Sequence, residues 1–414
     1  MDQKNSDESS FLKSEIQNLM KLYQDGKYEV TEKLASTLIK KFPGEIISYQ
    51  ILGSILKKRG RLNDALEINR KTVSIFPKSA KAHNNMGNTF KKLNRMDDAA
   101  SSYRKAIELD PDFIEPRMNL NSVSTKTIPL WHLSMMNDTK RNHAYFDAIK
   151  RAVEKEMFVL EIGTGSGLLS MMAADSGAKK VVTSETIKTI AKTAQQIVNE
   201  NGYEKKITVL NKKSTELIVG EDISRKADLL ISEVLSSEFV GEGIRTTLAD
   251  ANSRLLKEGG KVIPESGKIR VALIGDSSEI LDVTNVSSVC GYDLSKFNSI
   301  TANKIYVKLR NEAPFLSDPK DAFDICLSDT NKVVNEKKSF ELEASKSGTC
   351  VGLIQWMSIK LYEDIKYENV PGNVSSHWST PIYLFDKPIR IKVGDKVSIK
   401  SFLGRDSVWF YKSD

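Results

Sequence analysis

The chain has 414 residues, of which 40% are hydrophobic and 28% are charged, and its formal net charge is +7. This length predicts two to four domains, and the composition excludes a disordered or fibrous chain. No stretch of about 18 apolar residues is present, so we expect no membrane-spanning helix. The polar start Met1–Ser6 lacks the apolar core of a secretory signal, so we expect a cytoplasmic protein, with the nucleus as the alternative compartment.

Cysteine and histidine are too sparse and too scattered for a covalent framework or a metal site. Cys290, Cys326 and Cys350 are odd in number and far apart, which argues against disulfides and against a close-spaced zinc knuckle. None of the four histidines is paired at the spacing of metal ligands, so we expect no metal.

The positive charge is unevenly distributed along the chain. Residues 1–130 hold 22 Lys and Arg against 16 Asp and Glu, which is nearly all of the excess. A nucleic-acid interface needs basic residues interleaved with aromatic ones on one face. The basic run Lys57–Arg61 lies instead at an expected helix–turn junction, where solvated charge is ordinary. We therefore do not expect a nucleic-acid partner.

A sequence repeat fills the first third of the chain. Two consecutive segments of equal length align there without gaps. The matched positions are Tyr49 with His83, Leu52 with Met86, Gly53 with Gly87, Leu56 with Phe90, Ala65 with Ala99 and Pro77 with Pro111. This is the tetratricopeptide pattern, in which small residues let two antiparallel helices cross closely and a proline ends each unit.

We therefore predict an all-α tetratricopeptide domain at residues 10–123. Gly26 and Pro43 mark a weaker first copy of the repeat. The three repeats are expected at about 12–45, 46–79 and 80–113, and a capping helix at 114–123. Such a stack forms a concave groove that holds a protein partner. The alternative is a passive spacer or a dimer surface.

After a linker at 122–130, the pattern changes to alternating strands and helices. The apolar run Phe158–Ile162 leads into the glycine turn Gly163–Gly167, then a helix at Leu168–Asp175 and a second strand at Lys180–Thr183. This order is the first half of a Rossmann-like α/β fold, which we place at residues 131–264.

The spacing of the glycines indicates the cofactor. Gly163, Gly165 and Gly167 let the backbone approach a ligand closely, but Leu168 stands where a dinucleotide site has its third glycine. The observed Gly-x-Gly-x-Gly form is typical of S-adenosylmethionine sites and favours a methyltransferase over a dinucleotide-dependent enzyme. Glu185, just after the second expected strand, stands where a carboxylate binds the ribose hydroxyls.

Two carboxylates follow the expected strand Asp228–Ile231. Glu233 stands at the carboxyl end of that strand, where open α/β sheets bind ligands. Glu242 comes nine residues later in a glycine-flanked loop. Two carboxylates at the mouth of a cofactor site can hold a guanidinium through charge-assisted hydrogen bonds. The alternative is that one or both are ordinary loop acids.

From about residue 265 the pattern becomes one of short strands separated by turns. The strands are expected at Lys268–Ile274, Asp324–Leu327, Gly352–Leu361, Pro388–Val393 and Lys396–Phe402. This pattern predicts a β-barrel or sandwich over residues 265–414.

Taken together, these segments resemble the protein arginine N-methyltransferases, most closely their type 9 members, which also carry tetratricopeptide repeats, and then their type 7 members. The resemblance covers essentially the whole chain. Its motifs are the segment Trp131–Asn142 before the catalytic core, the cofactor motif Val159–Ser170, the adenine-side segment Asn211–Glu216, the double-glutamate loop Glu233–Glu242, the barrel motif Leu316–Pro319, and the loop Ser376–Trp378, in which Ser replaces the family's Thr.

The resemblance implies S-adenosylmethionine as the cofactor and assigns residues to it. Arg141 is expected to pair with the carboxylate of its methionine moiety, and Glu185 to hold its ribose. Gly163, Gly165 and Gly167 are expected to contact the cofactor as part of its binding motif. Ser214 and Thr215 are expected near the adenine.

The resemblance also implies an arginine side chain of a protein as the substrate. Glu233 and Glu242 are expected to grip its guanidinium. Asp138 and His377 are expected to form the hydrogen-bonded pair that this family has at its site, and Trp378 to wall the arginine channel.

The chain departs from this family in two ways. The Tyr-Phe-x-x-Tyr element of the asymmetrically dimethylating members is absent before Trp131, which speaks against an asymmetric product. One methyltransferase unit is present where types 7 and 9 carry two, so we expect the chain to pair with a second copy or to act alone.

Gly291–Ser299 is the candidate dimerisation arm.

We therefore predict a multidomain protein-arginine methyltransferase whose repeats recruit a substrate or an adaptor. One alternative is a methyltransferase of the same fold that acts on a small molecule. The other is a catalytically inactive tetratricopeptide scaffold.

Overall fold

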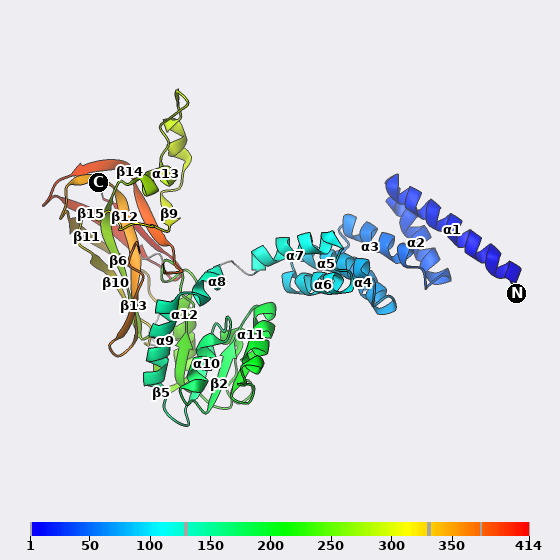
Figure 1. Ribbon diagram of the computed structural model, residues 1–414, viewed down its shortest axis with the longest axis horizontal. Coiled ribbons are helices and arrows are strands. Elements are labelled where there is room, and N and C mark those ends of the chain that lie inside the picture. The colour runs from blue at the N-terminus through cyan, green and yellow to red at the C-terminus, as the bar shows by residue number, and fades with distance from the viewer. Residues whose placement is uncertain (1, 128–130, 329–332, 373–374, 414) are drawn as a thin grey trace. The chain divides into compact units, whose positions relative to one another are not determined.

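The computed structural model describes residues 2–127, 131–328, 333–372 and 375–413. The chain divides into two compact units, Met1–Leu130 and Trp131–Asp414. The first unit is built from helices, and the second combines helices with sheets (Figure 1). No helix in the described ranges is long and apolar enough to span a bilayer.

The first unit is a row of paired helices. They are α1 (Asp2–Gln24), α2 (Tyr28–Lys41), α3 (Ile46–Lys58), α4 (Leu62–Ile75), α5 (Ala80–Lys92), α6 (Met96–Leu109) and α7 (Ile114–Thr127). A Cβ on Gly53 would lie 2.8 Å from Asn69 Oδ1, and one on Gly87 would lie 2.6 Å from the Tyr103 ring. Both glycines therefore stand where two helices cross closely, as the repeat pattern requires.

The expected linker at 122–130 is wrong in its first part. The helix α7 continues to Thr127, beyond the expected end of the capping helix. The segment contains no glycine, and its only proline is Pro129, so nothing in it stops the helix earlier. Residues 128–130 lie outside the described residues.

The second unit begins with helices and a parallel sheet. Its elements are α8 (Trp131–Met136), α9 (Thr139–Ala152), β1 (Phe158–Ile162), α10 (Leu168–Asp175), β2 (Lys180–Ser184), α11 (Lys188–Glu200), β3 (Ile207–Leu210), η1 (Ser214–Glu216), β4 (Ala227–Ser232), α12 (Ile244–Arg254) and β5 (Leu256–Ile263). The strand order is β3-β2-β1-β4-β5, and all neighbouring pairs are parallel. The order reverses between β1 and β4, which is where sheets of this kind bind ligands.

Antiparallel sheets follow β5. Their elements are β6 (Ser266–Gly275), α13 (Ser278–Thr284), β7 (Ser288–Val289), β8 (Tyr292–Asp293), η2 (Ser295–Ile300), β9 (Lys304–Val307), β10 (Lys320–Cys326), β11 (Glu336–Glu343), β12 (Gly348–Tyr362), β13 (Ile365–Glu368), β14 (Thr380–Ile391), β15 (Lys396–Leu403) and β16 (Val408–Lys412). One sheet has the order β10-β6-β12-β14-β9, with β13 paired to β12, and another has the order β11-β15-β16.

The expected strands of this region are present with different bounds. The strand β14 begins at Thr380 rather than Pro388. Pro381 does not prevent this earlier start, because a proline is tolerated near the beginning of a strand. The strand β10 begins at Lys320 rather than Asp324 and ends at Cys326. Closure of the strands into a barrel stays a prediction.

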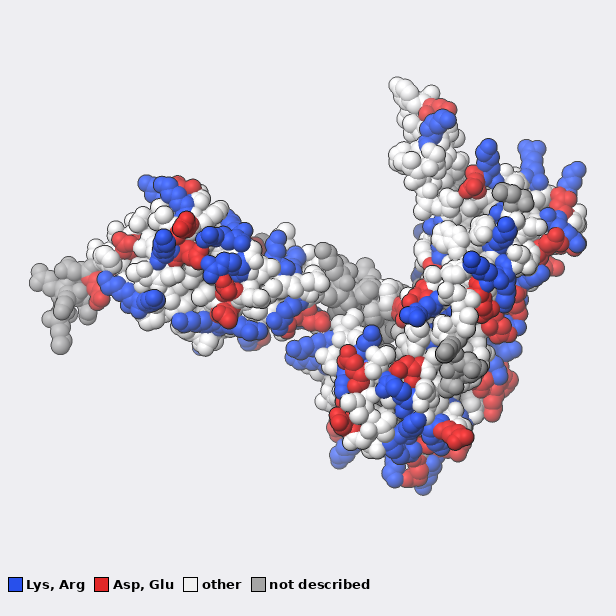
Figure 2. All heavy atoms as spheres, turned by 180° about the vertical axis from the view of Figure 1, so that it is seen from behind, with Lys and Arg blue, Asp and Glu red and all other residues white. Residues whose placement is uncertain are grey.

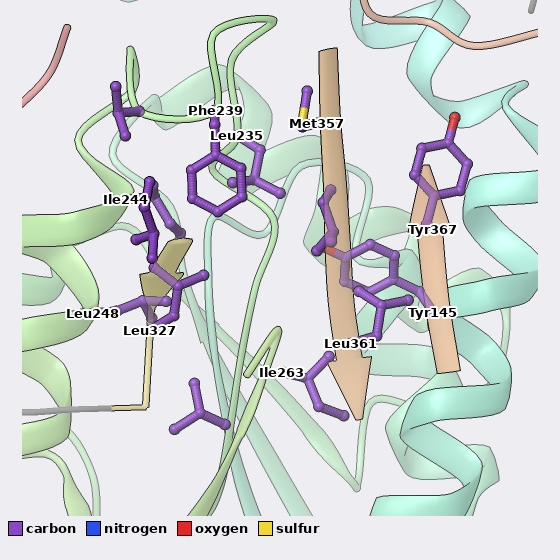
Figure 3. Packing of buried hydrophobic residues seen from close by; sticks show 14 of the residues in the cluster. Tyr145, Leu235, Phe239, Ile244, Leu248, Ile263, Leu327, Met357, Leu361 and Tyr367 are labelled. Atoms are coloured by element: carbon purple, nitrogen blue, oxygen red, sulfur yellow. The ribbon is translucent and has the colours of Figure 1, made fainter. Parts of the chain in front are cut away.

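One apolar core joins the parallel sheet to the antiparallel strands. Figure 3 shows Leu235 and Phe239, from the loop after β4, in one apolar cluster with Ile263 of β5 and Leu361 of β12. Phe239 is fully buried and has a positive φ of 77°. A Cβ on Gly267 in β6 would overlap the Phe239 ring, so this loop is held against β6 at a position that only glycine fits.

Candidate active site

Asp138 joins three of the elements around the site. As the N-cap of α9, its carboxylate accepts a hydrogen bond from the Arg141 backbone N–H at 3.1 Å. It also accepts from the Tyr367 hydroxyl and from the His377 backbone N–H, both at 3.0 Å, and lies 3.1 Å from His377 Nδ1. Burial alone would raise the pKa of Asp138, but these hydrogen bonds outweigh it and lower the pKa. The structure thus holds an ionised carboxylate against His377; the catalytic role of the pair stays a prediction.

Arg141 and Glu233 form a buried ion pair. The Arg141 Nη2 atom lies 2.5 Å from Glu233 Oε2, and the two side chains are 3% and 5% exposed. Within the described chain, Arg141 Nε and Glu233 Oε1 are buried without a hydrogen-bond partner. Burial raises the pKa of Glu233 to about 7; Arg141 opposes this shift and the charge of Glu242 adds to it.

These two orphaned atoms test the fit of the expected ligands. A buried donor or acceptor without a partner is costly, and such groups in native structures call for an explanation. The free N–H of Arg141 fits a carboxylate, and the free oxygen of Glu233 fits a guanidinium. These are the groups that the resemblance assigns to Arg141 and Glu233.

The glycine turn connects β1 to α10. Gly163, Gly165 and Gly167 have φ values of 87°, 53° and 83°, a region that side chains disfavour. The Gly165 N–H donates to the Glu185 carboxylate at 3.3 Å, and the Ile187 N–H donates to the same group at 2.9 Å. Glu185 follows β2, the neighbour of β1, and therefore lies across the turn where a ribose-binding carboxylate is expected.

Ser214 and Thr215 lie in η1, after β3. Ser214 is buried and Thr215 is exposed. The side chain of Asn211, just before them, donates to the Glu185 backbone oxygen at 2.9 Å, which ties this segment to the same edge of the sheet. No hydrogen bond in the described chain joins Ser214 or Thr215 to the other predicted site residues, so their place near an adenine stays a prediction.

A pocket of about 760 Å³ contains the remaining predicted residues. Glu242, His377 and Trp378 line it together with Trp131, the first residue of α8. The Trp378 indole N–H donates to the Leu235 backbone oxygen at 2.9 Å, and its ring lies 3.9 Å from the His377 ring, centroid to centroid. Trp378 is thus fixed as one wall.

The two acid–base groups in this pocket have shifted pKa values. Although Glu242 as a residue is exposed, partial burial of its carboxyl raises the pKa, and the charge of His132 opposes the shift. Burial lowers the pKa of His377; the hydrogen bond to Asp138 opposes this, while the charges of Arg141 and Lys308 add to it. His377 is therefore neutral near pH 7 and able to accept a proton.

Sequence reasoning missed one wall of the pocket. Glu238 forms a largely buried ion pair with Lys304 at 2.5 Å, in which the side chains are 12% and 11% exposed, and it accepts a hydrogen bond from the Tyr306 hydroxyl. The Lys304 ammonium lies 4.9 Å from the Tyr383 ring and 5.3 Å from the Trp409 ring. The sequence shows Glu238 as a third acid in the loop between Glu233 and Glu242. Its partners come from strands that are distant in the chain, so no pattern near Glu238 predicts these contacts.

Glu161 was also missed. It lies in the middle of a buried apolar strand, β1, is 1% exposed, and accepts a hydrogen bond from Ser170 in α10. Burial raises the pKa of Glu161 to about 7, although the hydrogen bonds from Ser170 and Thr183 oppose the shift. The charge of Glu185 raises it further. Glu161 therefore ties β1 to α10 beneath the glycine turn.

Three family models match the chain. They are the tetratricopeptide repeat over residues 80–113, the ribosomal protein L11 methyltransferase over 143–271, and the arginine methyltransferase oligomerization subdomain over 265–414.

Curated relatives identify the family. An arginine N(omega)-methyltransferase from Streptomyces achromogenes subsp. streptozoticus is 31% identical over 282 residues, which cover 67% of this chain and 77% of the relative. The chain belongs to the arginine methyltransferase family. Protein arginine N-methyltransferase 7 of Gallus gallus is 28% identical over 322 residues, and that of Drosophila yakuba is 41% identical over 323 residues. Each match covers 67% of this chain, and 45% and 46% of the relative.

This arginine methyltransferase family member thus spans less than half the length of its type 7 relatives. These relatives confirm the expected resemblance to type 7, whereas the closer likeness to type 9 stays a prediction.

Two solved structures share the fold. The Trypanosoma brucei PRMT1 enzyme–prozyme heterotetrameric complex with AdoHcy is 23% identical, with a TM-score of 0.60, covering 70% of this chain and 98% of that chain. Arabidopsis thaliana protein arginine methyltransferase 10 is 20% identical, with a TM-score of 0.56, covering 67% and 88%.

Replacing Glu161 by Gln should flatten the pH dependence of stability. Because the pKa is raised from 4.5 to about 7 in the folded state, the contribution of Glu161 is present below pH 4.5 and is lost as the pH rises through 7. Gln keeps the hydrogen bond from Ser170 without the charge. We expect Glu161→Gln to gain on the order of 1–3 kcal/mol relative to wild type between pH 5 and pH 8.

The measurement is the thermal unfolding midpoint across this pH range. Glu200→Gln, an exposed acid in α11, is the matched control and should follow the wild type. If Glu161→Gln also follows the wild type, the carboxyl is not a buried acid.

Proposed function

We propose that the protein transfers a methyl group from S-adenosylmethionine to a guanidino nitrogen of arginine in proteins. The observation that carries this proposal is the buried Arg141–Glu233 pair, which leaves one N–H and one carboxylate oxygen without partners. Membership in the arginine methyltransferase family supports the same reaction.

Each half of the site has residues suited to one reactant. Arg141 Nε would hold the carboxylate of the cofactor's methionine moiety, and the glycine turn with Glu185 would hold its ribose. Ser214 and Thr215 would lie toward the adenine. When bound, S-adenosylmethionine supplies an electrophilic methyl group, which leaves its sulfonium sulfur for the nitrogen.

The acids act on the guanidinium. An arginine side chain has a pKa above about 12 and remains protonated. Glu233, through its free oxygen, and Glu242 would orient one nitrogen and hold positive charge on the others. The proton lost from the methylated nitrogen would pass to a carboxylate or to neutral His377, which Asp138 orients. Trp378 would form one wall of the channel and so confine the side chain of the substrate arginine.

A second candidate is transfer to a free guanidine compound such as arginine itself. It is favoured by the name of the bacterial relative, an arginine rather than a protein-arginine methyltransferase. The tetratricopeptide repeats favour the protein substrate, because a small molecule needs no recruiting surface.

Replacing Glu233 or Glu242 by Gln should strongly slow methyl transfer while the protein still folds. We expect rates to fall by about 10²–10³-fold, because Gln keeps the shape but loses the charge that orients the guanidinium. The measurement is incorporation of labelled methyl groups from S-adenosylmethionine into proteins of a cell extract and, separately, into free arginine. Hydrolysis and separation of the amino acids then identify methylarginines.

Glu258→Gln, an exposed acid in β5, is the control and should leave transfer unchanged. Label in free arginine alone would replace the proposal by the second candidate. Binding of S-adenosylmethionine without methyl transfer to either substrate would favour the alternative of a catalytically inactive scaffold.

The repeats are proposed to hold a protein partner with an acidic segment. The first helices of the three repeats, α1, α3 and α5, form a row with the capping helix α7, in which each helix packs against the next. They are joined by polar contacts, of which Tyr23 to Ser54 at 2.7 Å and Lys91 to Ser122 at 3.0 Å are examples. In Figure 2, Lys and Arg side chains lie along the visible face of the repeat unit, with Asp and Glu side chains among them.

Lys57 and Lys92 make this row of helices positive. Neither has an ion-pair partner among the described residues, and the pKa of Lys57 is lowered by burial and by the charge of Lys92, although Tyr23 opposes the shift. Carboxylates of a partner would relieve this repulsion, so the surface suits an acidic segment rather than a basic one.

Lys57→Glu combined with Lys92→Glu should lower methylation of extract proteins several-fold. Methylation of a short arginine peptide should not change, because the repeats do not carry the reaction. Lys40→Glu with Arg104→Glu, on the exposed faces of α2 and α6, is the charge-matched control. Equal loss in both double variants would argue against a partner site on the first helices.

We also propose that the protein pairs with a second copy through the segment from α13 to η2. This segment projects away from the sheets in Figure 1 and contains the candidate arm Gly291–Ser299. Tyr292, Phe297 and Ile300 are 73%, 64% and 74% exposed, and such clustered apolar side chains mark interaction surfaces. The match to the oligomerization subdomain over 265–414 supports the pairing.

Phe297→Asp with Ile300→Asp should shift the protein toward monomer in sedimentation velocity runs, because a charged side chain cannot be buried cheaply at an interface. Val393→Asp, an exposed apolar residue in a turn outside the segment, should behave like the wild type. A wild type that sediments as a monomer at all concentrations would contradict the pairing.

A further inference from the structure

A second pocket, of about 300 Å³, lies in the catalytic unit beside the loop that carries His377 and Trp378. It is formed where the chain after β9 and the chain after β13 approach the start of β14. Its polar and aromatic lining residues are Lys308, Arg310, Asn369, Ser376, Trp378 and Thr380. None of the residues assigned above to the cofactor or to the double-glutamate loop lines it.

Asn369 supplies a buried donor without a partner. The residue is 2% exposed, and its Oδ1 accepts a hydrogen bond from the Met357 backbone N–H at 2.8 Å. Its own backbone N–H donates to the Met357 oxygen at 3.2 Å. These bonds fix the orientation of the side-chain amide, so the remaining group, Nδ2, is a true N–H donor. Within the described chain it has no hydrogen-bond partner.

Two cations line the same pocket. The side chains of Lys308 and Arg310 form no ion pair in the described ranges of the chain, and no aspartate or glutamate there lines the pocket. Glu279 contacts this segment, but it accepts from the backbone N–H of Arg310 at 3.1 Å and from the Asn311 side chain at 2.6 Å. The lining of the pocket therefore includes two exposed cations and the residue Asn369, which carries the buried donor, and no carboxylate of the described residues is part of it.

We propose that this pocket binds a small oxyanion, a carboxylate or a phosphate group. The guanidinium of Arg310 and the ammonium of Lys308 would bind its oxygens through charge-assisted hydrogen bonds. Asn369 Nδ2 would donate the bond that it lacks now. The volume is at the lower end of ligand-binding cavities, which suits a small anionic group rather than a nucleotide.

The anion would contact the candidate active site through one side chain. Trp378 lines both this pocket and the pocket of about 760 Å³ that contains Glu242. Ser376, two residues earlier, lies 3.2 Å from the Tyr367 hydroxyl, which donates to Asp138. An occupant of the second pocket therefore supports the same loop that walls the arginine channel.

The test follows the indole N–H of Trp378 by nuclear magnetic resonance. The full-length protein is labelled with ¹⁵N-tryptophan, and Trp378→Phe assigns the resonance among the four tryptophans. Sodium phosphate and the capped amino acid N-acetylglutamate amide are titrated separately at constant ionic strength. We expect a saturable shift of the Trp378 resonance; the anion that saturates at the lower concentration identifies phosphate or carboxylate as the natural group.

Variants keep the test independent of activity. Lys308→Ala with Arg310→Ala should weaken binding at least about tenfold, because both charged contacts are lost. Asn369→Asp keeps the bond from Met357 but places a carboxylate in the pocket, and should abolish the saturable shift. Lys337→Ala with Arg390→Ala, two exposed cations on other strands, is the charge-matched control and should bind like the wild type.

Two outcomes would overturn the proposal. One is the absence of a saturable shift with either anion. The other is an equal affinity in the wild type and in the Lys308→Ala, Arg310→Ala variant, which would show that the anion binds elsewhere.

Discussion

The buried carboxylate of Asp138 is the interaction on which the candidate site depends. It accepts hydrogen bonds from the start of α9, from β13 and from the loop before β14, and the last two segments are distant from it in the chain. A charge with no solvent contact is tolerated only when it is surrounded by donors. Those donors come from both the Rossmann-like region and the antiparallel strands. Asp138 can therefore be buried at low cost only when these two regions are correctly positioned against each other.

The same arrangement leaves the site incomplete in a definite way. Asp138 fixes the first turn of α9, and that turn presents Arg141 to Glu233. The ion pair satisfies only part of each group and leaves a donor and an acceptor buried without partners. The carboxylate and the guanidinium proposed above as ligands would relieve this cost and would make the pair half of a larger network. The apolar packing of Phe239 and Leu235 beneath the loop offsets the cost and keeps the acids in place.

The parts of this protein that could be predicted from its sequence are those whose signal is local. The helical repeat, the strand–glycine turn–helix unit and the acids after β4 each lie within one short segment, and each occurs where expected. The Lys304–Glu238 pair could not be predicted, since it joins two segments distant in the chain through packing against aromatic rings. Glu161 looked like part of an apolar strand, and only the contact with Ser170 reveals its role. The segment 122–127 is helical where a linker is expected from the sequence, because its Ser and Thr residues are compatible with both structures.

The close approach of Gly267 to Phe239 has a consequence for how the sequence can vary. Any side chain at position 267 would occupy the volume of the Phe239 ring, and a smaller residue at 239 would open a cavity beneath the double-glutamate loop. Neither position can therefore drift alone without moving the acids. Substitutions that preserve the fold would have to occur at both positions together. A residue larger than glycine at 267 would require a residue smaller than phenylalanine at 239.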